Sequence, residues 1–513
     1  MSGTVMTAPV DRALSTQTGR RPRAAAVLAL ARFEARELVL HVPVFVFFVL
    51  YVAYTCWRLW SGREGMDAFP ALQDADRATQ DRPMLVGIAL FVCANRAALR
   101  SRRRGTDRHF DTLVMEPWRR TAAHALSAVP LAAACALVVV FDFTCTALKP
   151  GAVGHGSVAE LAVGPLGVLL SGVLGVLTAR LIPSVFAVPL LALGGFVFAI
   201  FVANGTDNAR WGQWLWPAVN ETRSDPLPSD LIGRPAAWHV LYLIGLIALL
   251  VGTAVLVSGG RTRLIKAGTA LAVAATVAGM AGQSAGDPAG LADARETASV
   301  TPEKVQSCVP HGSSTYCAYP EWTDRTADWA AVVGRVQSLA GGSAGGARLT
   351  VRQRVDARYG LSGDAALEPS GKPGQVTVGT RWGGNRVPEF AVAVASVLVA
   401  GDERSGGEVC GARGVTTMWL ALGTDADPMA ALRQVRLDDS TSGSAIAITP
   451  TDSVGMTARQ TTVVRQLLQQ PRYGVTAKVK AHWTELTSPR TTTARAAELL
   501  DLPVPKGEDD CGE

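Results

Sequence analysis

Seven long apolar segments constrain the fold of this chain more than any other feature of its sequence. Each is close to the roughly 20 residues that an α-helix needs to cross the hydrocarbon core of a bilayer. Asn95 and Arg96 interrupt the second segment, and the last is rich in Ala and Gly. The segments occupy residues 38–57, 82–99, 125–148, 158–179, 185–203, 238–257 and 264–281. They predict a membrane α-helical bundle with six or seven transmembrane helices.

The N-terminal segment, residues 1–37, is typical of a cytoplasmic extension and not of a cleaved leader. A secretory signal has a short basic start, a short apolar core and a small-residue cleavage site. Here a long polar stretch with Arg20, Arg21 and Arg23 precedes a full-length apolar segment, so we expect an uncleaved anchor. Residues 24–40 mix apolar and charged side chains and can form a helix along the membrane surface. A plain extension of the first transmembrane helix is the alternative.

The charged residues predict the orientation of the helices. The formal charge is +6, and basic residues concentrate before the first apolar segment and in the connections at 100–120 and 261–266. The connection at 58–81 is rich in acidic residues. Under the positive-inside rule the N-terminus lies in the cytoplasm, and seven crossings place the C-terminal part outside. We therefore expect a multi-pass protein of the cell membrane with an extracytoplasmic C-terminal domain.

Charge and composition also exclude some classes of protein. Only 18% of the residues are charged and the mean hydropathy is +0.21, which argues against intrinsic disorder. The basic residues lie between apolar segments, whereas a nucleic-acid binder has them together on one exposed face. We expect no nucleic-acid partner.

The cysteines support an external C-terminal part. Four of them lie within apolar segments, and the other four are Cys308, Cys317, Cys410 and Cys511 in the polar C-terminal part. Disulfides persist in oxidising compartments. Cys308 pairs with Cys317 by proximity and Cys410 with Cys511 by elimination, although four cysteines allow three connectivities. A zinc site is the weaker alternative because no C-x-x-C spacing is present and no His pair stands at ligand spacing, so we expect no metal.

The chain divides into four parts by composition. Residues 1–37 are the cytoplasmic segment, 38–282 the transmembrane part, 283–302 a small-residue linker and 303–513 the disulfide-containing domain. The last part has the pattern of a mixed α/β domain. Its predicted helices lie at 326–339, 388–399, 457–470 and 491–500, and its predicted strands at 349–355, 375–380 and 416–422.

Catalytic motifs are weak in this sequence. It has no phosphate-binding loop of the form G-x-x-x-x-G-K-[ST] and no H-E-x-x-H. Two G-x-S-x-G matches, at Ser284 and Ser343, lack the strand before and helix after that a nucleophile elbow needs. We expect no enzyme, no catalytic residue and no cofactor.

Two features inside or beside the apolar segments have a structural and a functional interpretation. Asp142 lies within the third segment, and we expect it to be hydrated near the outer interface; a functional buried acid is the alternative. Trp211, Trp214 and Trp216 are typical of an interfacial aromatic belt or a short re-entrant helix. A ligand-binding aromatic cluster is the second interpretation of these three residues.

A family resemblance rests on residues near the first two apolar segments. Arg32-Phe33-Glu34, followed by Glu37, resembles the start of bacterial type 2 ABC transporter permeases. The stretch 100–120 resembles that family's cytoplasmic coupling helix, which docks into a separate ATPase subunit. The residues that carry this second match are Arg104, Gly105, Thr106, Phe110, Leu113 and Pro117. The alternative for 100–120 is that its Arg residues fix the topology and bind anionic lipid.

The resemblance, which covers about residues 24–260, implies a permease subunit of an ATP-driven exporter. Such a subunit contacts membrane lipid, forms a homodimer or heterodimer with a second permease chain, and relies on an ABC ATPase partner to hydrolyse ATP. The large external domain departs from the family, although Cys308–Cys317 followed by Pro320 resembles a segment of some actinobacterial permease-like proteins. A membrane-anchored extracytoplasmic binding, sensor or regulatory protein is the alternative function.

Overall fold

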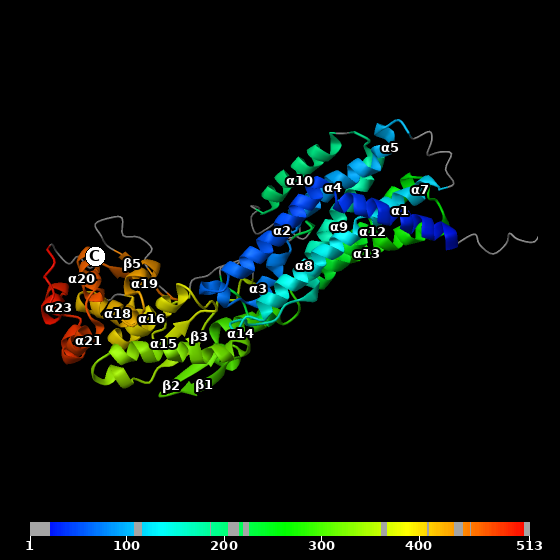
Figure 1. Cartoon of the computed structure of the whole chain (residues 1–513). Helices are drawn as coiled ribbons and strands as arrows, with labels where there is room; N and C mark the ends of the chain where they lie inside the picture. Colours follow the sequence, from blue (N-terminus) through cyan, green and yellow to red (C-terminus); the bar gives the residue numbers. More distant parts are fainter. Residues whose placement is uncertain are drawn as a thin grey trace, which may run out of the picture.

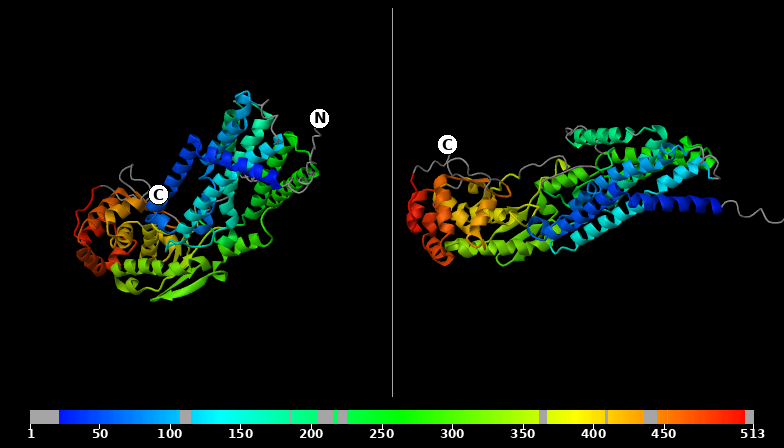
Figure 2. Two further views of the ribbon diagram at one scale, coloured as in Figure 1. Left: turned by 45° about the vertical axis from the view of Figure 1, so that its right-hand side comes forward. Right: turned by 45° about the horizontal axis from the view of Figure 1, so that its top comes forward.

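The computed structural model contains a long helical bundle that joins a C-terminal domain end to end (Figure 1). The two further views in Figure 2 show the same elongated arrangement, with α1 (Arg21–Val39) near the end of the bundle farthest from the domain. The structure describes residues 21–106, 115–184, 186–203, 215–218, 225–360, 367–407, 410–435, 445–451 and 453–506.

The bundle is built from long apolar helices and short polar connections. Its main helices are α1, α2 (Val42–Ser61), α4 (Met84–Ala98), α5 (Arg100–Arg103), α7 (Pro117–Leu126), α8 (Val129–Ala147), α9 (Val158–Leu181), α10 (Ala187–Ala203), α12 (Ala236–Val257) and α13 (Arg263–Gln283). The short helix α3 (Leu72–Ala75) lies in the connection between α2 and α4. A turn at residues 40–41 separates α1 from α2, so residues 24–40 do not simply extend the first apolar helix.

Five helices are long and apolar enough to cross a membrane: α2, the run through α7 and α8, α9, α12 and α13. The other two apolar segments are shorter as helices, with 15 residues in α4 and 17 in α10. Many apolar side chains point away from the bundle, including Phe45 and Leu50 on α2 and Leu271 on α13. Exposed apolar faces of this extent mark interaction surfaces and, with five helices of membrane-spanning length, are consistent with a membrane protein.

Close helix contacts in the bundle depend on glycine. A Cβ atom on Gly279 of α13 would overlap the backbone of Tyr242 on α12, and one on Gly245 would overlap the backbone of Thr276. Small residues at a helix interface let two backbones approach closely, which is the main source of packing energy between helices in lipid. The pair α12–α13 therefore packs backbone against backbone.

The C-terminal domain contains a four-stranded mixed sheet in the order β1-β2-β3-β4. Its strands are β1 (Ser307–His311), β2 (Ser314–Ala318), β3 (Thr350–Gln353) and β4 (Gln375–Val378), and β5 (Ala445–Ile448) and β6 (Ser453–Met456) form a separate antiparallel pair. Strands β1 and β2 are antiparallel, whereas β2, β3 and β4 run parallel. Parallel neighbours need long crossovers, and α15 (Thr326–Leu339) provides the one between β2 and β3.

Helices form most of the rest of this domain. They are α16 (Arg386–Ala400), α17 (Glu403–Gly406), α18 (Ala412–Leu422), α19 (Pro428–Val435), α20 (Ala458–Leu468), α21 (Arg472–Ala481), α22 (Trp483–Leu486) and α23 (Thr493–Leu499). Helices α16 and α18 are almost fully buried, and Trp329, Phe390 and Trp419 belong to one continuous core. The four predicted helices are confirmed as α15, α16, α20 and α23, and two predicted strands as β3 and β4.

The predicted strand at 416–422 is wrong, because these residues form the second half of α18. Thr416, Thr417 and Trp419 favour a strand by local propensity. In the structure all residues of this half-helix are buried, and the Thr416 hydroxyl donates to the Ala412 carbonyl at 2.7 Å within the helix. Burial on all sides removes the periodicity that distinguishes a helix from a strand.

The bundle and the C-terminal domain share a continuous junction. The segment 283–302, which the sequence predicts as a linker, contains α14 (Leu291–Val300). Arg295 of α14 is buried and donates to the carbonyls of Leu231 and Ile232 at 2.8 Å each. Leu231 and Ile232 belong to the core of the C-terminal domain, so a connection between bundle helices is part of that core.

A second contact joins the α2–α4 connection to the domain. The Arg325 guanidinium carbon lies 4.5 Å from the ring centroid of Phe69, a cation–π contact. Gly383 and Gly384 have positive φ and approach the backbone of Gly65 closely. These contacts fix the domain directly against the bundle.

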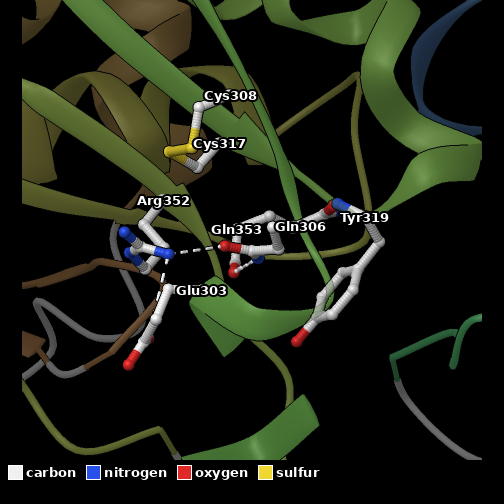
Figure 3. The surroundings of a disulfide bond; sticks show 7 residues. All are labelled: Glu303, Gln306, Cys308, Cys317, Tyr319, Arg352 and Gln353. Carbon is white, nitrogen blue, oxygen red and sulfur yellow. Dashed lines mark hydrogen bonds and ion pairs between the residues drawn. A yellow bond between two sulfur atoms is a disulfide. The ribbon is translucent and has the colours of Figure 1, made fainter. Parts of the chain in front are cut away.

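The predicted disulfide Cys308–Cys317 is confirmed, and it joins directly opposite residues of β1 and β2. Figure 3 shows a polar network beside it, in which Arg352 donates to Gln306 Oε1 at 2.8 Å and Gln353 Oε1 accepts the Tyr319 N–H at 3.0 Å. Cys511 lies outside the described residues, so the pair Cys410–Cys511 stays a prediction.

Removing this disulfide is expected to destabilise the domain by about 3 kcal/mol, because the bond closes a short loop in the unfolded chain. The test compares thermal unfolding of the double variant C308S/C317S with that of the wild type under non-oxidising and oxidising conditions. C56S, which replaces an exposed cysteine on α2, is the control and should unfold like the wild type. Equal stability of wild type and double variant would contradict the prediction.

Candidate functional site

A cavity of about 800 Å³ lies at the end of the bundle opposite the C-terminal domain. Four parts of the chain form its walls: α1, the end of α4 with α5, the start of α7 and the last turn of α9. Its lining residues are Leu30, Phe33, Glu34, Ala97, Ala98, Arg100, Ser101, Arg102, Arg104, Thr106, Pro117, Arg120, His124 and Arg180. Five arginines and one carboxylate make it a basic cavity.

Local sequence explains how the predicted coupling segment enters this cavity. Helix α5 stops at Gly105, whose φ of 65° is left-handed and favours glycine. The N–H of Thr106 then turns back to the Ser101 carbonyl at 3.0 Å. Pro117 occupies the first position of α7, where its missing N–H costs no hydrogen bond. Gly105 and Pro117 thus mark the end of α5 and the start of α7 within the predicted coupling segment.

Ion pairs of Arg100, and a contact of His124 that carries charge only when the imidazole is protonated, join α1 to this segment. Arg100 Nη2 lies 3.6 Å from Glu34 Oε2 and 3.6 Å from Glu37 Oε2. His124 Nδ1 of α7 lies 3.8 Å from the same Glu34 oxygen. Burial raises the pKa of the Glu34 carboxyl, and the nearby Arg100 opposes this shift. Glu34 is thus the acidic centre around which α1, α5 and α7 meet.

The structure brings three of the six predicted coupling residues to the cavity wall, namely Arg104, Thr106 and Pro117. Gly105 forms the adjoining turn, and Phe110 and Leu113 lie outside the described residues. Arg120 belongs to the predicted stretch 100–120, whereas the sequence interpretation missed the contributions of His124 and Arg180. The sequence signal that could have found Arg180 is its position as a basic residue at the end of an apolar segment.

Helix α7 also connects the cavity to another pair of helices. The Thr121 hydroxyl donates to Ser258 Oγ at 2.8 Å, at the end of α12. Gly260, in the connection to α13, packs so closely on Trp118 that a Cβ there would lie 3.1 Å from the Trp118 Cβ. A partner that displaces α7 would therefore also displace the α12–α13 pair.

Asp142 has a different environment from the predicted one. Its side chain is buried, with 2% exposure, and accepts hydrogen bonds from Arg58 and Arg82. Asp142 lies on α8 and Arg58 on α2, whereas Arg82 lies in the turn just before α4. The expected hydrated carboxylate is wrong: a buried acid needs paired charge, and the two arginines provide it.

A further buried acid, Asp76, lies in the connection between α2 and α4. Its carboxylate accepts the N–H of Arg77 at 2.5 Å and that of Ser157 at 2.7 Å. Burial, helped by the nearby Glu160, raises the pKa of Asp76 to about 7 against the opposing effects of the Ser157 N–H and Arg234. The ordinary value is 3.8, so the folded protein holds a proton here more tightly than the unfolded chain.

Stability is therefore expected to fall as the pH rises from about 4 to about 7, because the folded state must then give up its more tightly held proton. The side chain at position 76 cannot ionise in the variant D76N. The melting temperature of D76N should therefore lack this part of the fall with rising pH, which amounts to several degrees in the wild type. Thermal unfolding in detergent between pH 4 and 8 tests this. D230N, at an exposed position, should behave like the wild type. Parallel curves for D76N and wild type would contradict the assignment.

No match emerges from comparison with known proteins: no family model fits the sequence, and no curated protein or solved structure is significantly similar to it. Within the described ranges, no group of three or more His, Cys, Asp or Glu side chains could hold a metal ion. Fold and site together give a helical protein with five helices long and apolar enough to cross a membrane, a disulfide-containing domain and a basic cavity at the opposite end.

Proposed function

We propose that this chain is the permease subunit of an ATP-driven exporter of the type 2 ABC class, energised by a separate ATPase chain. The observation that carries the proposal is the basic cavity, where Arg104, Thr106 and Pro117 of the predicted coupling segment meet α1. A membrane subunit without a phosphate-binding loop needs another chain to supply the energy of ATP. That chain needs a docking surface. The cavity is a concave surface, and the exposed aromatic side chain of Phe33 forms part of it.

The contacts of α7 supply a route from this surface into the bundle. If the ATPase moves α7 at the cavity, this movement reaches α12 through Thr121 and Ser258. It reaches the α12–α13 connection through Trp118. Because α12 and α13 pack backbone to backbone, they would move as one unit. Transport by such a movement needs no catalytic residue in this chain.

The proposal includes a topology of seven crossings, with α4 and α10 as the two short ones. The cavity end, with its basic connections, then faces the cytoplasm. The C-terminal domain lies outside, where an oxidising environment maintains Cys308–Cys317. A second permease chain, identical or related, would complete the transport path, and the exposed apolar faces that remain would contact lipid.

One observation favours the alternative, a membrane-anchored extracytoplasmic sensor. The C-terminal domain is fixed on the bundle through Arg295 and Arg325, so a ligand bound outside could act on the helices. In the exporter, the same junction would let the domain gate the path or hand on substrate. The two functions differ in whether an ATPase binds at the cavity.

The deciding experiment is gentle-detergent purification of the tagged chain from its native host, with identification of the co-purifying proteins. We expect a stoichiometric chain that carries a phosphate-binding loop. The variants R104E and F33D alter cavity-lining residues and should reduce its recovery at least tenfold. K266E reverses an exposed charge at the start of α13, outside the cavity, and should leave recovery unchanged. If no ATPase accompanies the wild-type chain, the exporter proposal fails and the sensor takes its place.

A further inference from the structure

A second cavity, of about 230 Å³, lies inside the bundle between α4, α9 and α10. Segment 215–218 closes one side of it through Trp216, Pro217 and Ala218. The cavity shares no lining residue with the basic cavity at the end of the bundle. The exporter proposal does not use it.

Its shape follows from small residues on the helices. On α4 the lining runs from Met84 to Phe91, and on α9 from Val163 to Leu174, so it extends about 10 to 16 Å along the helix axes at 1.5 Å per residue. Gly167 of α9 and Gly195 of α10 leave space for it: a Cβ on either would only touch Pro217 or Trp216, at 3.9 and 3.7 Å. The result is a slot parallel to the helices.

The walls of this slot are apolar. None of its lining residues carries a charge, and the Ser171 hydroxyl is already donated to the Gly167 carbonyl of its own helix at 2.8 Å. The polar end is at Gln80, whose amide donates to Glu160. Such a slot offers a ligand dispersion contacts along its length and polar groups at one end only.

The slot opens sideways at the surface of the bundle. Ile88, Leu174 and Leu191 line it and are 38%, 38% and 47% exposed, so the same side chains face both the slot and the surroundings of the bundle. In a membrane protein those surroundings are hydrocarbon. An aliphatic chain can therefore enter from the bilayer without crossing water.

The closing segment is held in place by two buried side chains of α12. His239 Nε2 lies 3.2 Å from the Pro217 carbonyl, and the Tyr242 hydroxyl donates to the Leu215 carbonyl at 3.1 Å. His239 is fixed in turn by Gln283 of α13, 3.0 Å from its Nδ1. The indole of Trp216 thus becomes a fixed part of the wall.

We propose that this slot binds one aliphatic chain of a membrane amphiphile, with the polar head of that molecule at the Gln80 end. The slot has the length for an extended chain, an apolar lining, a lateral opening at membrane depth and a single polar end. Together these features match an extended hydrocarbon chain and no polar or charged ligand. The assignment gives Trp216 a ligand-binding role. It rests on the slot alone and stands whether or not an ATPase binds at the other end.

Photo-crosslinking of the full chain tests the proposal. The purified protein is placed in vesicles of phosphatidylglycerol and phosphatidylethanolamine that contain a trace of palmitic acid or of phosphatidylglycerol with a diazirine on the chain. After irradiation, labelled peptides are identified by mass spectrometry. We expect labelling to concentrate on residues 84–91 and 163–174, several-fold above the other apolar helices.

Three glycine variants make the test specific. G167L and G195L place a side chain in the slot from opposite walls and should reduce the slot labelling at least fivefold. G194L, next to Gly195, meets no neighbour within 4 Å and should leave the labelling unchanged. Labelling spread evenly over all apolar helices, or equal in G195L and G194L, would overturn the proposal, because it would indicate only the lipid that surrounds any bundle.

The two probes distinguish the sources of the chain. If only the phospholipid probe labels the slot, the ligand is a bilayer lipid, and if only the fatty acid does, it is a free amphiphile. Labelling by both shows that the hydrocarbon chain itself is recognised. Each of these results supports the slot as a binding site, and the absence of slot labelling with both probes refutes it.

Discussion

The variant D142A is expected to lose about 3–5 kcal/mol of stability, enough to abolish an assembled bundle. Asp142 is the buried carboxylate that accepts from Arg58 and Arg82, so its removal leaves two partly buried guanidinium groups without a counter-charge. Arg82 is the more buried of the two, with a side-chain exposure of 13%. An unpaired charge at this depth costs more than the lost ion pairs alone.

Thermal unfolding and yield in detergent measure this effect. E64Q removes an exposed carboxylate just beyond α2 and should match the wild type. The double variant D142N/R82Q removes one charge of each sign and should recover part of the loss, because Arg58 at 26% exposure reaches water more readily. If D142A were as stable as E64Q, the ion cluster of Asp142, Arg58 and Arg82 would not contribute to stability.

The variant G279V is expected to cost about 3 kcal/mol or more, because its Cβ would overlap the backbone of Tyr242 and rotamer changes cannot relieve this. The matched control is G268V on the same helix, where a Cβ meets nothing within 4 Å. Both substitutions change helix propensity equally, so the difference in melting temperature isolates the contact with α12. Equal melting temperatures would mean that α12 and α13 do not pack this closely.

The apolar segments and the disulfide were accessible from sequence because each depends on a local property. A segment as long as α9 or α12 has few alternatives to a membrane helix. Cys308 and Cys317 are separated by nine positions and flank a turn at Gly312, so strand pairing brings them opposite each other. Arg104 and Thr106 of the predicted coupling segment lie at a cavity wall, and the docking of a partner there stays a prediction.

Other features could not be predicted because they depend on contacts between distant segments. Asp142 alone in an apolar segment does not reveal that Arg58 of α2 and Arg82, in the turn before α4, approach it. The segment 283–302 has the composition of a linker, yet Arg295 ties it to Leu231 and Ile232. Neither partner is near its counterpart in the sequence.

By itself the sequence determined the kind of protein: membrane helices, a covalently closed hairpin and the main helices of the C-terminal domain. The tertiary structure decided how these parts fit, including the helical state of α18, the ion cluster at Asp142 and both cavities. The apolar length of a segment and the pairing of neighbouring residues can be judged from that segment alone. Charge pairing and enclosed space arise only when several segments meet, since each requires side chains whose separation is fixed by the fold and not by the chain.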